Sequence, residues 1–342
     1  MNKNRGIHII SGFPGKDFGP ELKYLISDIG VGGLIFFSDN IENPLQLAKL
    51  CTRIQKHALG VLDRPLFLMI DHEGGRVQRC GKPFFLIPAA SEIAKSGIDP
   101  KKYPEIAAKE LKLVGLNVNL APVADIEPRS PHQFLRGRTF GDNPEIVSRY
   151  VLGALHVFIQ NSIIPTVKHF PGLGEAVQDP HETLPVIRRN LAEIMNWELV
   201  PFANAIKAGC PCMMTSHALY PAIDEKLPAT LSRKIMVELL RKQLGYAGVV
   251  ISDDLEMGAI SKFGDLEIVL DLAMESENDF LLFCHDIDLV SRAQEFLNSH
   301  MGYEKFTTYH IDSLPRIEQL YGLLDKNNII PDIEKVKEYF KL

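Results

Sequence analysis

Short apolar, β-branched segments alternate with longer amphipathic segments along the whole of this 342-residue chain. This alternation constrains the fold most, because it is typical of βα units and not of a sandwich or a helical bundle. Eight segments have the character of strands: Gly6 to Ser11, Gly32 to Phe37, Leu66 to Asp71, Asn117 to Asp125, Ile164 to His169, Met213 to His217, Val249 to Asp253 and Phe280 to Cys284. Helical segments fall between them, at 44–59, 105–114, 144–160, 191–208, 233–240 and 265–274.

Eight such alternations predict an α/β fold, a single (β/α)8 TIM-type barrel domain covering residues 1–342. The first unit is the weakest because its helix, at 20–29, is short, and this leaves open a barrel that is distorted there. The segment at about 312–342 is expected to form terminal helices that pack outside the barrel.

The composition disfavours several classes of function. Hydrophobic residues make up 46% and charged residues 23%, as in ordinary globular proteins. The net charge of −6, with no basic run, argues against a nucleic-acid partner. No apolar stretch approaches the roughly 20 residues that span a bilayer, so no membrane partner is expected. The first apolar run is interrupted at Ser11 and Gly12, which favours a cytoplasmic protein without an export signal.

Polar residues collect where the predicted strands end. They are Asp71, Asp125, Lys168 and His169, Ser216 and His217, Ser252 to Asp254, and His285. Barrel enzymes carry their chemistry at the carboxyl ends of the strands, because a charge inside the barrel would have to lose its water. The sequence therefore predicts an active site at this rim.

Asp253 and Asp254 follow the apolar run Val249 to Ile251 and Ser252 at the end of the seventh predicted strand. Neighbouring residues on a strand point in opposite directions. One carboxylate can therefore face the barrel mouth while the other turns towards the following helix as a cap or an ion-pair partner. The alternative is that both are ordinary acids at a helix start.

Asp71 also ends a predicted strand, and Gly74 and Gly75 follow it closely. Two glycines without the pattern of a phosphate-binding loop indicate a turn, which would bring Arg76 or Arg79 back over the rim. Arg138 lies in another glycine-flanked loop. Each arginine could instead be a loop residue held in a salt bridge.

An irregular segment at 168–185 contains prolines, glycines and several side chains that bind or transfer protons. Long loops of this kind are uncommon in compact domains unless they are functional. Lys168 and His169 suit hydrogen bonding to hydroxyl groups, although a salt bridge at the rim is an alternative. Asp179 and His181 form a candidate pair for general acid–base chemistry. His217 could equally contact a ligand or support another residue.

A metal or organic cofactor is not expected. Histidine and aspartate at one rim could bind a metal, but the chain has no His-X-His or His-Glu-X-X-His spacing. The five cysteines are scattered without the spacing of a zinc module or a disulfide framework, which indicates reduced thiols.

Together these segments resemble the bacterial β-N-acetylglucosaminidases of glycoside hydrolase family 3, the NagZ type that acts in peptidoglycan recycling. The resemblance covers most of the chain and rests on the following motifs: Gly32 to Phe37, Asp71 to Arg79, Asn119 to Asp125, Gly137 to Gly141, Lys168 to Gly172, Asp179 to His181, Ser216 and His217, and Ser252 to Leu255. Their order and spacing make a chance match improbable.

The resemblance implies a retaining mechanism with a covalent glycosyl-enzyme intermediate. Asp253 would be the nucleophile, and His181 would be the acid/base, oriented by its dyad partner Asp179. Five further positions match residues that bind the non-reducing N-acetylglucosamine: Asp71, Arg79, Arg138, Lys168 and His169.

The activity implied is that of a β-N-acetylhexosaminidase that removes terminal N-acetylglucosamine from 1,6-anhydro-N-acetylmuramic acid fragments, with or without peptide. Its partner would be this small-molecule muropeptide, and a monomer is expected. A phosphorylase that transfers the sugar to phosphate is an alternative, because a histidine acid/base would not repel an incoming phosphate as a carboxylate would. A sugar-binding barrel without catalysis is a further alternative.

The chain departs from the family pattern within the 168–185 segment. Leu173 replaces a histidine, Glu175 and Ala176 replace Asp-Thr, and Pro180 replaces the common serine. Pro180 fixes its own φ and biases the preceding residue towards extended backbone. We expect activity to survive these changes because Asp179, His181 and Asp253 are all present.

Overall fold

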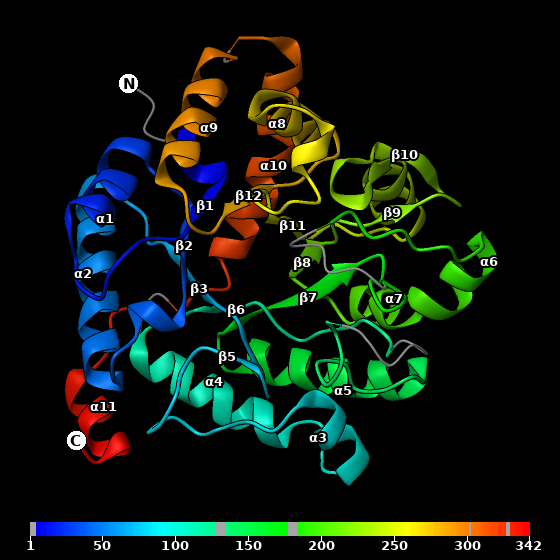
Figure 1. Cartoon of the computed structure of the whole chain (residues 1–342). Coiled ribbons are helices and arrows are strands. Elements are labelled where there is room, and N and C mark those ends of the chain that lie inside the picture. Colours follow the sequence, from blue (N-terminus) through cyan, green and yellow to red (C-terminus); the bar gives the residue numbers. More distant parts are fainter. Residues whose placement is uncertain (1–4, 128–133, 177–182, 301, 326–328) are drawn as a thin grey trace.

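Eight parallel strands close into a barrel in this computed structural model, which describes residues 5–127, 134–176, 183–300, 302–325 and 329–342 (Figure 1). In order around the barrel they are β1 (Ile9–Ser11), β2 (Gly33–Phe36), β3 (Phe67–Ile70), β6 (Val118–Asn119), β7 (Ile164–Phe170), β8 (Cys212–Thr215), β11 (Val249–Asp254) and β12 (Phe280–Phe283). Each lies within or overlaps one predicted strand, so the predicted (β/α)8 fold is confirmed.

Alternate residues of the strands separate two apolar layers. On β3, Phe67 and Met69 belong to the core cluster inside the barrel, whereas Leu68 and Ile70 pack in the cluster between barrel and helices. All four are fully buried. Strands covered on both faces need apolar residues at consecutive positions, which explains the short unbroken apolar runs in the sequence.

The α-helices surround the strands (Figure 1). They are α1 (Pro20–Tyr24), α2 (Pro44–Leu62), α3 (Ala90–Ser96), α4 (Lys102–Val114), α5 (Pro144–Gln160), α6 (Leu191–Glu193), α7 (Val200–Lys207), α8 (Leu266–Glu275), α9 (Ile287–Ser299), α10 (Glu304–Tyr321) and α11 (Ile333–Phe340). Segments with π-type hydrogen bonding are η2 (Leu25–Ile29), η4 (Ile194–Glu198) and η6 (Lys234–Gln243). Short 3-10 turns are η1 (Arg5–His8), η3 (Ser38–Asn40), η5 (Ala229–Leu231) and η7 (Ser261–Phe263). None of the helices in the described ranges is both long and apolar enough to cross a bilayer.

Two of the strands, the first and the fourth, are shorter than predicted by three residues or more. The first begins only at Ile9, because residues 5–8 form η1, yet β1 pairs in parallel with both β2 and β12. The fourth is limited to β6, followed by a single bridge between Val123 and Lys168. Pro122 lies between β6 and this bridge, and a proline has no N–H to donate to a sheet ladder. The barrel therefore closes despite its short first unit.

Two small antiparallel hairpins follow barrel strands at the carboxyl end. The first pairs β4 (His72–Gly74) with β5 (Val77–Gln78), and the second pairs β9 (Leu219–Tyr220) with β10 (Asp224–Pro228). In the first hairpin Gly74 and Gly75 have φ of 100° and 57°, values that favour glycine. The predicted turn at these glycines is confirmed.

The terminal helices differ in part from the prediction. Helix α10 begins at Glu304 and not near residue 312, so that Pro315 lies inside it. A start near 312 would place this proline in the first turn, where proline is well tolerated. Ile317 and Leu320 of α10 also join the core cluster of the barrel interior. Helix α10 therefore covers the amino end of the barrel, and does not pack on its outer wall alone.

Candidate active site

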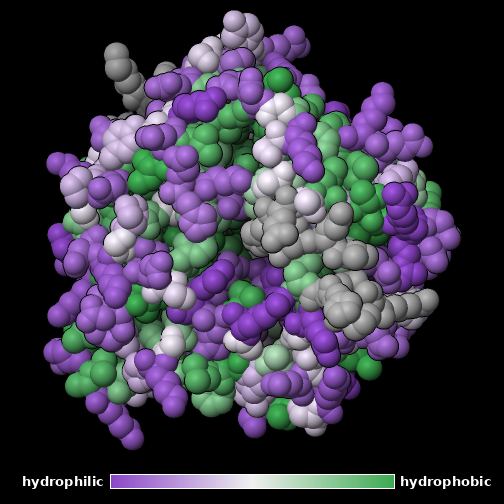
Figure 2. All heavy atoms as spheres, viewed as in Figure 1, coloured by the Kyte–Doolittle hydropathy of each residue, from purple (hydrophilic) through white to green (hydrophobic). Residues whose placement is uncertain are grey.

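The carboxyl ends of the strands surround a cavity with an empty volume of about 1050 Å³. Figure 2 shows this face of the molecule hollowed near its centre. Six of the predicted site residues line the cavity: Asp71, Arg79, Arg138, Lys168, His169 and Asp253. They come from the residues directly after β3 and β5, from the loop before α5, and from β7 and β11, so the predicted convergence at the rim takes place.

Lys168 is the centre of a buried ion-pair network. Its Nζ lies 2.6 Å from Asp71 Oδ1 and 2.7 Å from Glu73 Oε1, and its side chain is only 3% exposed. Arg138 donates two hydrogen bonds to Glu73, from Nε at 2.8 Å and from the second terminal nitrogen at 2.7 Å. Arg79 approaches Asp71 at 3.5 Å. Lys168 and the arginines are therefore oriented before any ligand arrives.

The same network keeps its members charged. Burial alone would raise the pKa of Glu73, but Lys168 and Arg138 hold it well below its usual range. Burial would lower the pKa of Lys168, yet Asp71 and Glu73 raise it overall. Opposite charges at hydrogen-bond distance thus outweigh the cost of desolvation.

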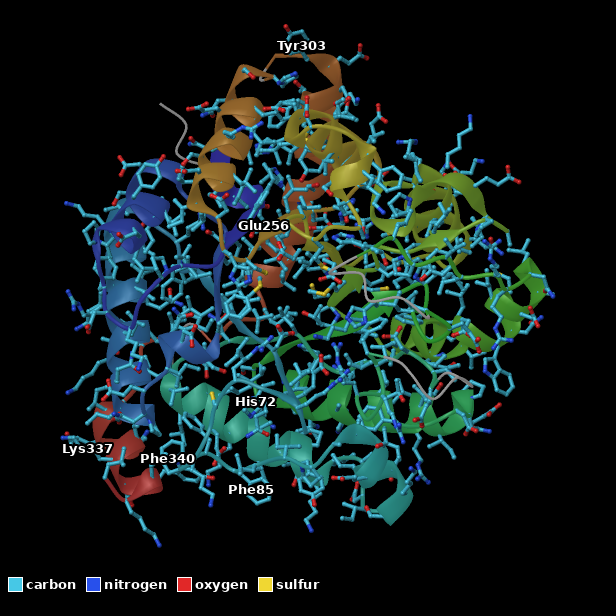
Figure 3. The ribbon with its side chains drawn as sticks, in the orientation of Figure 1. His72, Phe85, Glu256, Tyr303, Lys337 and Phe340 are labelled. Carbon is cyan, nitrogen blue, oxygen red and sulfur yellow. The ribbon has the colours of Figure 1, made fainter. Side chains whose placement is uncertain are left out.

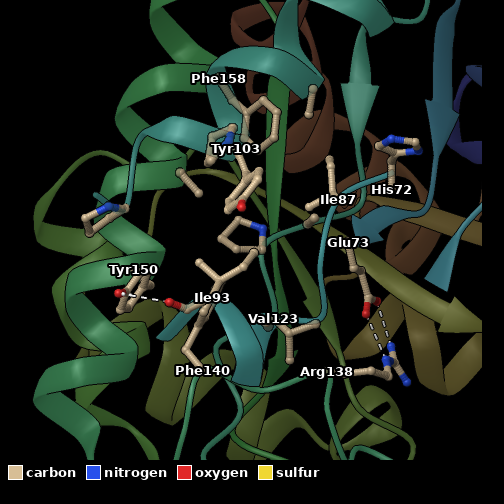
Figure 4. A pocket seen from close by; sticks show the side chains of 17 residues that line it. His72, Glu73, Ile87, Ile93, Tyr103, Val123, Arg138, Phe140, Tyr150 and Phe158 are labelled. Atoms are coloured by element: carbon tan, nitrogen blue, oxygen red, sulfur yellow. Dashed lines mark hydrogen bonds and ion pairs between the residues drawn. The ribbon is translucent and has the colours of Figure 1, made fainter. Parts of the chain in front are cut away.

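Glu73 and Arg138 also border a second, mostly apolar cavity behind the network (Figure 4). Helices α3, α4 and α5 supply much of its lining, including Tyr103, Tyr150 and Phe158. Few groups on that side could compete for the two charges, which favours their bidentate pairing with each other.

His169 is held from below by Asp125. Its Nδ1 lies 2.6 Å from Asp125 Oδ2, and its backbone N–H donates to Oδ1 at 3.3 Å. Asp125 is fully buried. Since the Asp125 carboxylate accepts a hydrogen bond from Nδ1–H, Nε2 is the ring nitrogen of His169 that is left for another partner.

Asp253 is the carboxylate whose surroundings best suit a nucleophile. Burial by itself would raise its pKa, but His217, His169, the backbone N–H of Asp254 and Lys168 together lower it. The Asp254 N–H donates to Asp253 Oδ1 at 2.9 Å. An ionised carboxylate therefore faces the cavity at neutral pH.

Asp254 differs from its neighbour in contacts and in pKa. Its Oδ1 accepts the N–H groups of Glu256 at 3.1 Å and Cys284 at 3.3 Å. Burial, Glu256 and Asp253 raise its pKa to about 6. Glu256, near the centre of Figure 3, in turn accepts the N–H groups of His285 and Asp286. Asp254 thus caps the turn after β11 and bonds to the residue that follows β12, where the sequence had suggested a helix cap or an ion-pair partner. It also lines the cavity.

His217 supports β11. Its Nε2 donates to the carbonyl oxygen of Asp254 at 2.9 Å, and its Nδ1 lies 2.7 Å from Thr230 Oγ1. The ring is fully buried. Of the two roles left open by the sequence, the geometry favours support of a neighbouring residue.

An aromatic wall completes one side of the cavity. The Arg79 guanidinium lies over the ring of Phe37 at 5.3 Å, and Phe37 contacts the ring of His285 at 5.0 Å between centroids. Arg76, the other arginine considered for this role, is exposed and does not line the cavity. Arg79 is therefore the arginine that the Gly74–Gly75 turn brings over the rim.

The proposed acid/base pair, Asp179 and His181, lies outside the described residues, as does Pro180. The two other departures from the family pattern are described. Leu173 is buried against the rim, and its N–H donates to Asp125 Oδ1 at 2.7 Å. Glu175 forms an ion pair with Arg189.

Sequence reasoning missed Glu73 and the partnership of Asp125 with His169. A signal for Glu73 exists: it stands two residues after Asp71 in an extended segment, so both side chains share one face. Asp125 stands at a strand end but gives no sign of its partner. Among the described residues no group of three His, Cys, Asp or Glu side chains could hold a metal ion.

The arrangement combines an ionised carboxylate with several oriented donors and acceptors for hydroxyl groups. Lys168, Arg79 and Arg138 can donate, and Asp71 can accept through its remaining lone pairs. A pocket of this kind suits a polyhydroxylated ring whose anomeric carbon lies beside Asp253.

Two relatives with similar sequences are β-hexosaminidases, enzymes that act on sugars. β-Hexosaminidase A of Pseudoalteromonas piscicida is 36% identical over 263 residues, which cover 71% of this chain and 44% of that protein. A β-hexosaminidase of Thiobacillus denitrificans is 35% identical over 272 residues, which cover 77% of this chain and 74% of that protein. This chain thus spans less than half the length of the first relative and about three quarters of the second.

Solved structures resemble the whole barrel. A glycoside hydrolase family 3 β-N-acetylglucosaminidase from Paenibacillus sp. str. FPU-7 superposes with a TM-score of 0.87 at 31% identity, over 98% of this chain and 68% of that one. NagZ from Neisseria gonorrhoeae, in complex with N-trifluoroacetyl-D-glucosamine, has a TM-score of 0.77 at 26% identity, over 92% and 97% of the two chains. Residues 10–312 match the model of the glycosyl hydrolase family 3 N-terminal domain. This chain therefore belongs to glycosyl hydrolase family 3.

Proposed function

We propose that this protein is a retaining exo-β-N-acetylglucosaminidase. Its substrate would be N-acetylglucosamine linked to 1,6-anhydro-N-acetylmuramic acid, with or without peptide. The protein would act as a monomer in the cytoplasm, in cell-wall recycling. The observation that carries the proposal is the partly buried, ionised Asp253, which shares one cavity with Lys168, His169 and Arg138. The relatives, which include β-hexosaminidases and a β-N-acetylglucosaminidase, support N-acetylglucosamine as the sugar that is released.

In the first step Asp253 attacks the anomeric carbon as the bond to the leaving group breaks. His181 donates its proton to the departing oxygen, and a covalent glycosyl-enzyme forms. In the second step His181 takes a proton from water, the water oxygen attacks the same carbon, and Asp253 is released. Asp179 would orient the histidine ring and favour its charged form.

The ion-pair network would bind the hydroxyl groups of the non-reducing sugar. Asp71 and Arg79 are the partly exposed members, with side chains 16% and 31% exposed, so they can meet a ligand directly. Glu73 is 4% exposed and would act by holding Lys168 and Arg138 in place. Preorganised donors of this kind spare the cost of reorganisation during the reaction.

Turnover of 4-nitrophenyl N-acetyl-β-glucosaminide by the unchanged protein, Asp253→Ala and His181→Ala would test the assignment. We expect both variants to lose most activity. An inactive unchanged protein, or a fully active Asp253→Ala variant, would overturn the proposal. A fluorinated sugar trap with peptide mass analysis would then show whether Asp253 or Asp254 carries the covalent bond.

Two further measurements address the substrate. Products should be identified with and without phosphate, because accumulation of the sugar 1-phosphate would favour a phosphorylase over a hydrolase. The disaccharide with 1,6-anhydro-N-acetylmuramic acid should be compared with its peptide-bearing form. Cleavage of neither would contradict the proposed recycling substrate while leaving the glycosidase activity intact.

A further inference from the structure

Two stems, at 172–175 and 185–187, flank the segment 177–182 in the chain. Both are hydrogen-bonded to the rim of the barrel. On the first stem, the Leu173 N–H donates to Asp125 Oδ1 at 2.7 Å. Gly174 then lies so close to the barrel that a Cβ there would be 2.0 Å from the carbonyl oxygen of Ile126. Only glycine allows this approach, so the first stem is fixed on Asp125 and Ile126, in the loop that follows β6.

The second stem, at 185–187, is fixed on β9. The Ile187 N–H donates to the Leu219 carbonyl at 2.9 Å, and the Leu219 N–H donates to the Pro185 carbonyl at 2.9 Å. The Tyr220 hydroxyl, on the same strand, donates to the carbonyl of Gly172 at 2.8 Å. Strand β9 therefore connects the two stems, through its backbone at the second stem and through the Tyr220 side chain at the first.

Arg189 connects the stems a second time, through charge. It pairs with Glu175 on the first stem and approaches Glu193 of α6 at 3.5 Å and Glu198 of η4 at 3.7 Å. The Arg189 side chain is 15% exposed and that of Glu175 is 29% exposed. An ion pair this sheltered is screened less by salt than one on an open surface.

We propose that Arg189 is a positioning residue for the reaction: through Glu175 it sets the separation of the two stems that precede and follow the acid/base His181 in the chain. This inference rests on the proposed function, in which His181 protonates the leaving group. Glu175 is one of the positions where this chain departs from its family, so the pair is a property of this chain's own residues.

The effect should depend on the leaving group. A poor leaving group needs a well-placed acid, whereas a dinitrophenolate departs with little help. General acid catalysis contributes roughly 100- to 10,000-fold, and a misplacement of about 1 Å can cost roughly 100-fold. For substrates with a poor leaving group, the methyl N-acetyl-β-glucosaminide or the disaccharide with 1,6-anhydro-N-acetylmuramic acid, we therefore expect Arg189→Met to lower kcat/KM by about 10- to 100-fold. For the 2,4-dinitrophenyl glycoside we expect a loss of less than about threefold.

Three further variants complete the test. Glu175→Gln removes the same pair from its more exposed side and should show the same dependence, even if Arg189→Met folds poorly. Arg189→Lys should recover part of the loss. Arg188→Met is the matched control, because Arg188 is the neighbouring arginine and is exposed. It should leave kcat/KM unchanged for both substrates.

The outcomes separate the two proposals. If His181→Ala shows the dependence on the leaving group and neither Arg189→Met nor Glu175→Gln does, the positioning role is wrong and the acid/base assignment stands. Equal losses on both substrates in the Arg189 and Glu175 variants would likewise contradict positioning. If His181→Ala itself shows no such dependence, the acid/base assignment fails.

Discussion

The two ends of the barrel each carry a buried network of charges, built from the same kinds of residue. At the carboxyl end Lys168 and Arg138 meet Asp71 and Glu73. At the amino end Asp279, just before β12, meets Arg241 at 2.8 Å and Arg316 of α10 at 2.8 Å.

The two networks differ in whether they are covered by protein or exposed to a cavity. Asp279 is fully buried, and both of its carboxylate oxygens have partners. Oδ1 pairs with Arg316, and Oδ2 pairs with Arg241 and also accepts the Val250 N–H at 2.7 Å. Helix α10 covers that end. At the other end Asp71 and Arg79 stay partly exposed to an open cavity. A saturated network joins elements together, whereas an unsaturated one can bind a ligand.

Histidines show the same contrast. At the amino end His8 is fully buried, 2.8 Å from His310 and bonded to the Asp279 carbonyl, and burial lowers its pKa to about 4. At the carboxyl end His169 contacts the carboxylate of Asp125. The first histidine is uncharged and structural at neutral pH, and the second lies where a ligand can reach it.

The largest expected effect is on stability, at the amino end. Asp279→Asn removes the carboxylate that Arg241 and Arg316 share, although Glu277 stays 3.6 Å from Arg241. Breaking a buried pair in this way costs about 3–5 kcal/mol of unfolding free energy. Urea unfolding would measure the loss. The folded variant should keep kcat/KM within about twofold, since nothing at the rim changes. A stable variant with a large loss of activity would contradict the contrast between the two ends.

The next effect is on activity, at the carboxyl end. Lys168→Met should lower kcat/KM by about 100- to 1000-fold, the usual cost of losing one preorganised donor. Steady-state kinetics with 4-nitrophenyl N-acetyl-β-glucosaminide would measure it. Asp71 and Glu73 also lose a partner, so urea unfolding should accompany the kinetics. An active but unstable variant would show that this network serves folding alone.

Glu198 tests what happens when a buried acid has too few partners. Burial raises its pKa to about 8 although Arg189 lies nearby, and its Oε2 has no hydrogen-bond partner among the described residues. The folded state then holds this proton more tightly than the unfolded state. Stability from this group therefore falls as pH rises from the ordinary glutamate value, about 4.5, to about 8, and is constant above.

Glu198→Gln carries no titrating group there. Relative to this variant, the unchanged protein should lose on the order of a few kcal/mol of unfolding free energy between about pH 5 and pH 8. Urea unfolding of both proteins across that range would measure the difference. A difference that stays flat with pH would show that Glu198 is ionised in the folded state.

The smallest effect is expected at an exposed pair. Lys242 and Glu238 lie 2.8 Å apart one helical turn from each other, with side chains 63% and 55% exposed. Lys242→Met should change the unfolding free energy by less than about 0.5 kcal/mol and leave kcat/KM unchanged. It serves as the control for the charge removals above. A cost like that of Asp279→Asn would mean that burial does not explain the difference.

Much of the barrel could be predicted from local sequence. All eight strands could be predicted, because a strand covered on both faces requires a short apolar run and a helical pattern separates each run from the next. Helix α9, which follows the last strand, was not predicted. The errors fall where local pattern is a poor guide. The fourth strand ends before Pro122 and is shorter than predicted. Helix α10 begins at Glu304, before the predicted start near residue 312, and contains Pro315.

The site was predicted as a set of positions, but not as a set of contacts. Asp71, Lys168 and Asp253 could be placed at one rim because parallel strands in a barrel end on the same side. The proposed roles of Asp179 and His181 remain predictions. The contacts of Glu73 with Lys168 and Arg138 could not be predicted, because these partners lie far away in the sequence and one comes from another loop.

The sequence by itself determined the order of the βα units and the side of the barrel on which the polar residues meet, since both follow from periodicity along neighbouring residues. Only the tertiary structure decided which charges are satisfied by one another and which are left for a ligand. That distinction depends on burial and on distances between residues such as Asp125 and His169 or Glu175 and Arg189, which come together only when the barrel closes.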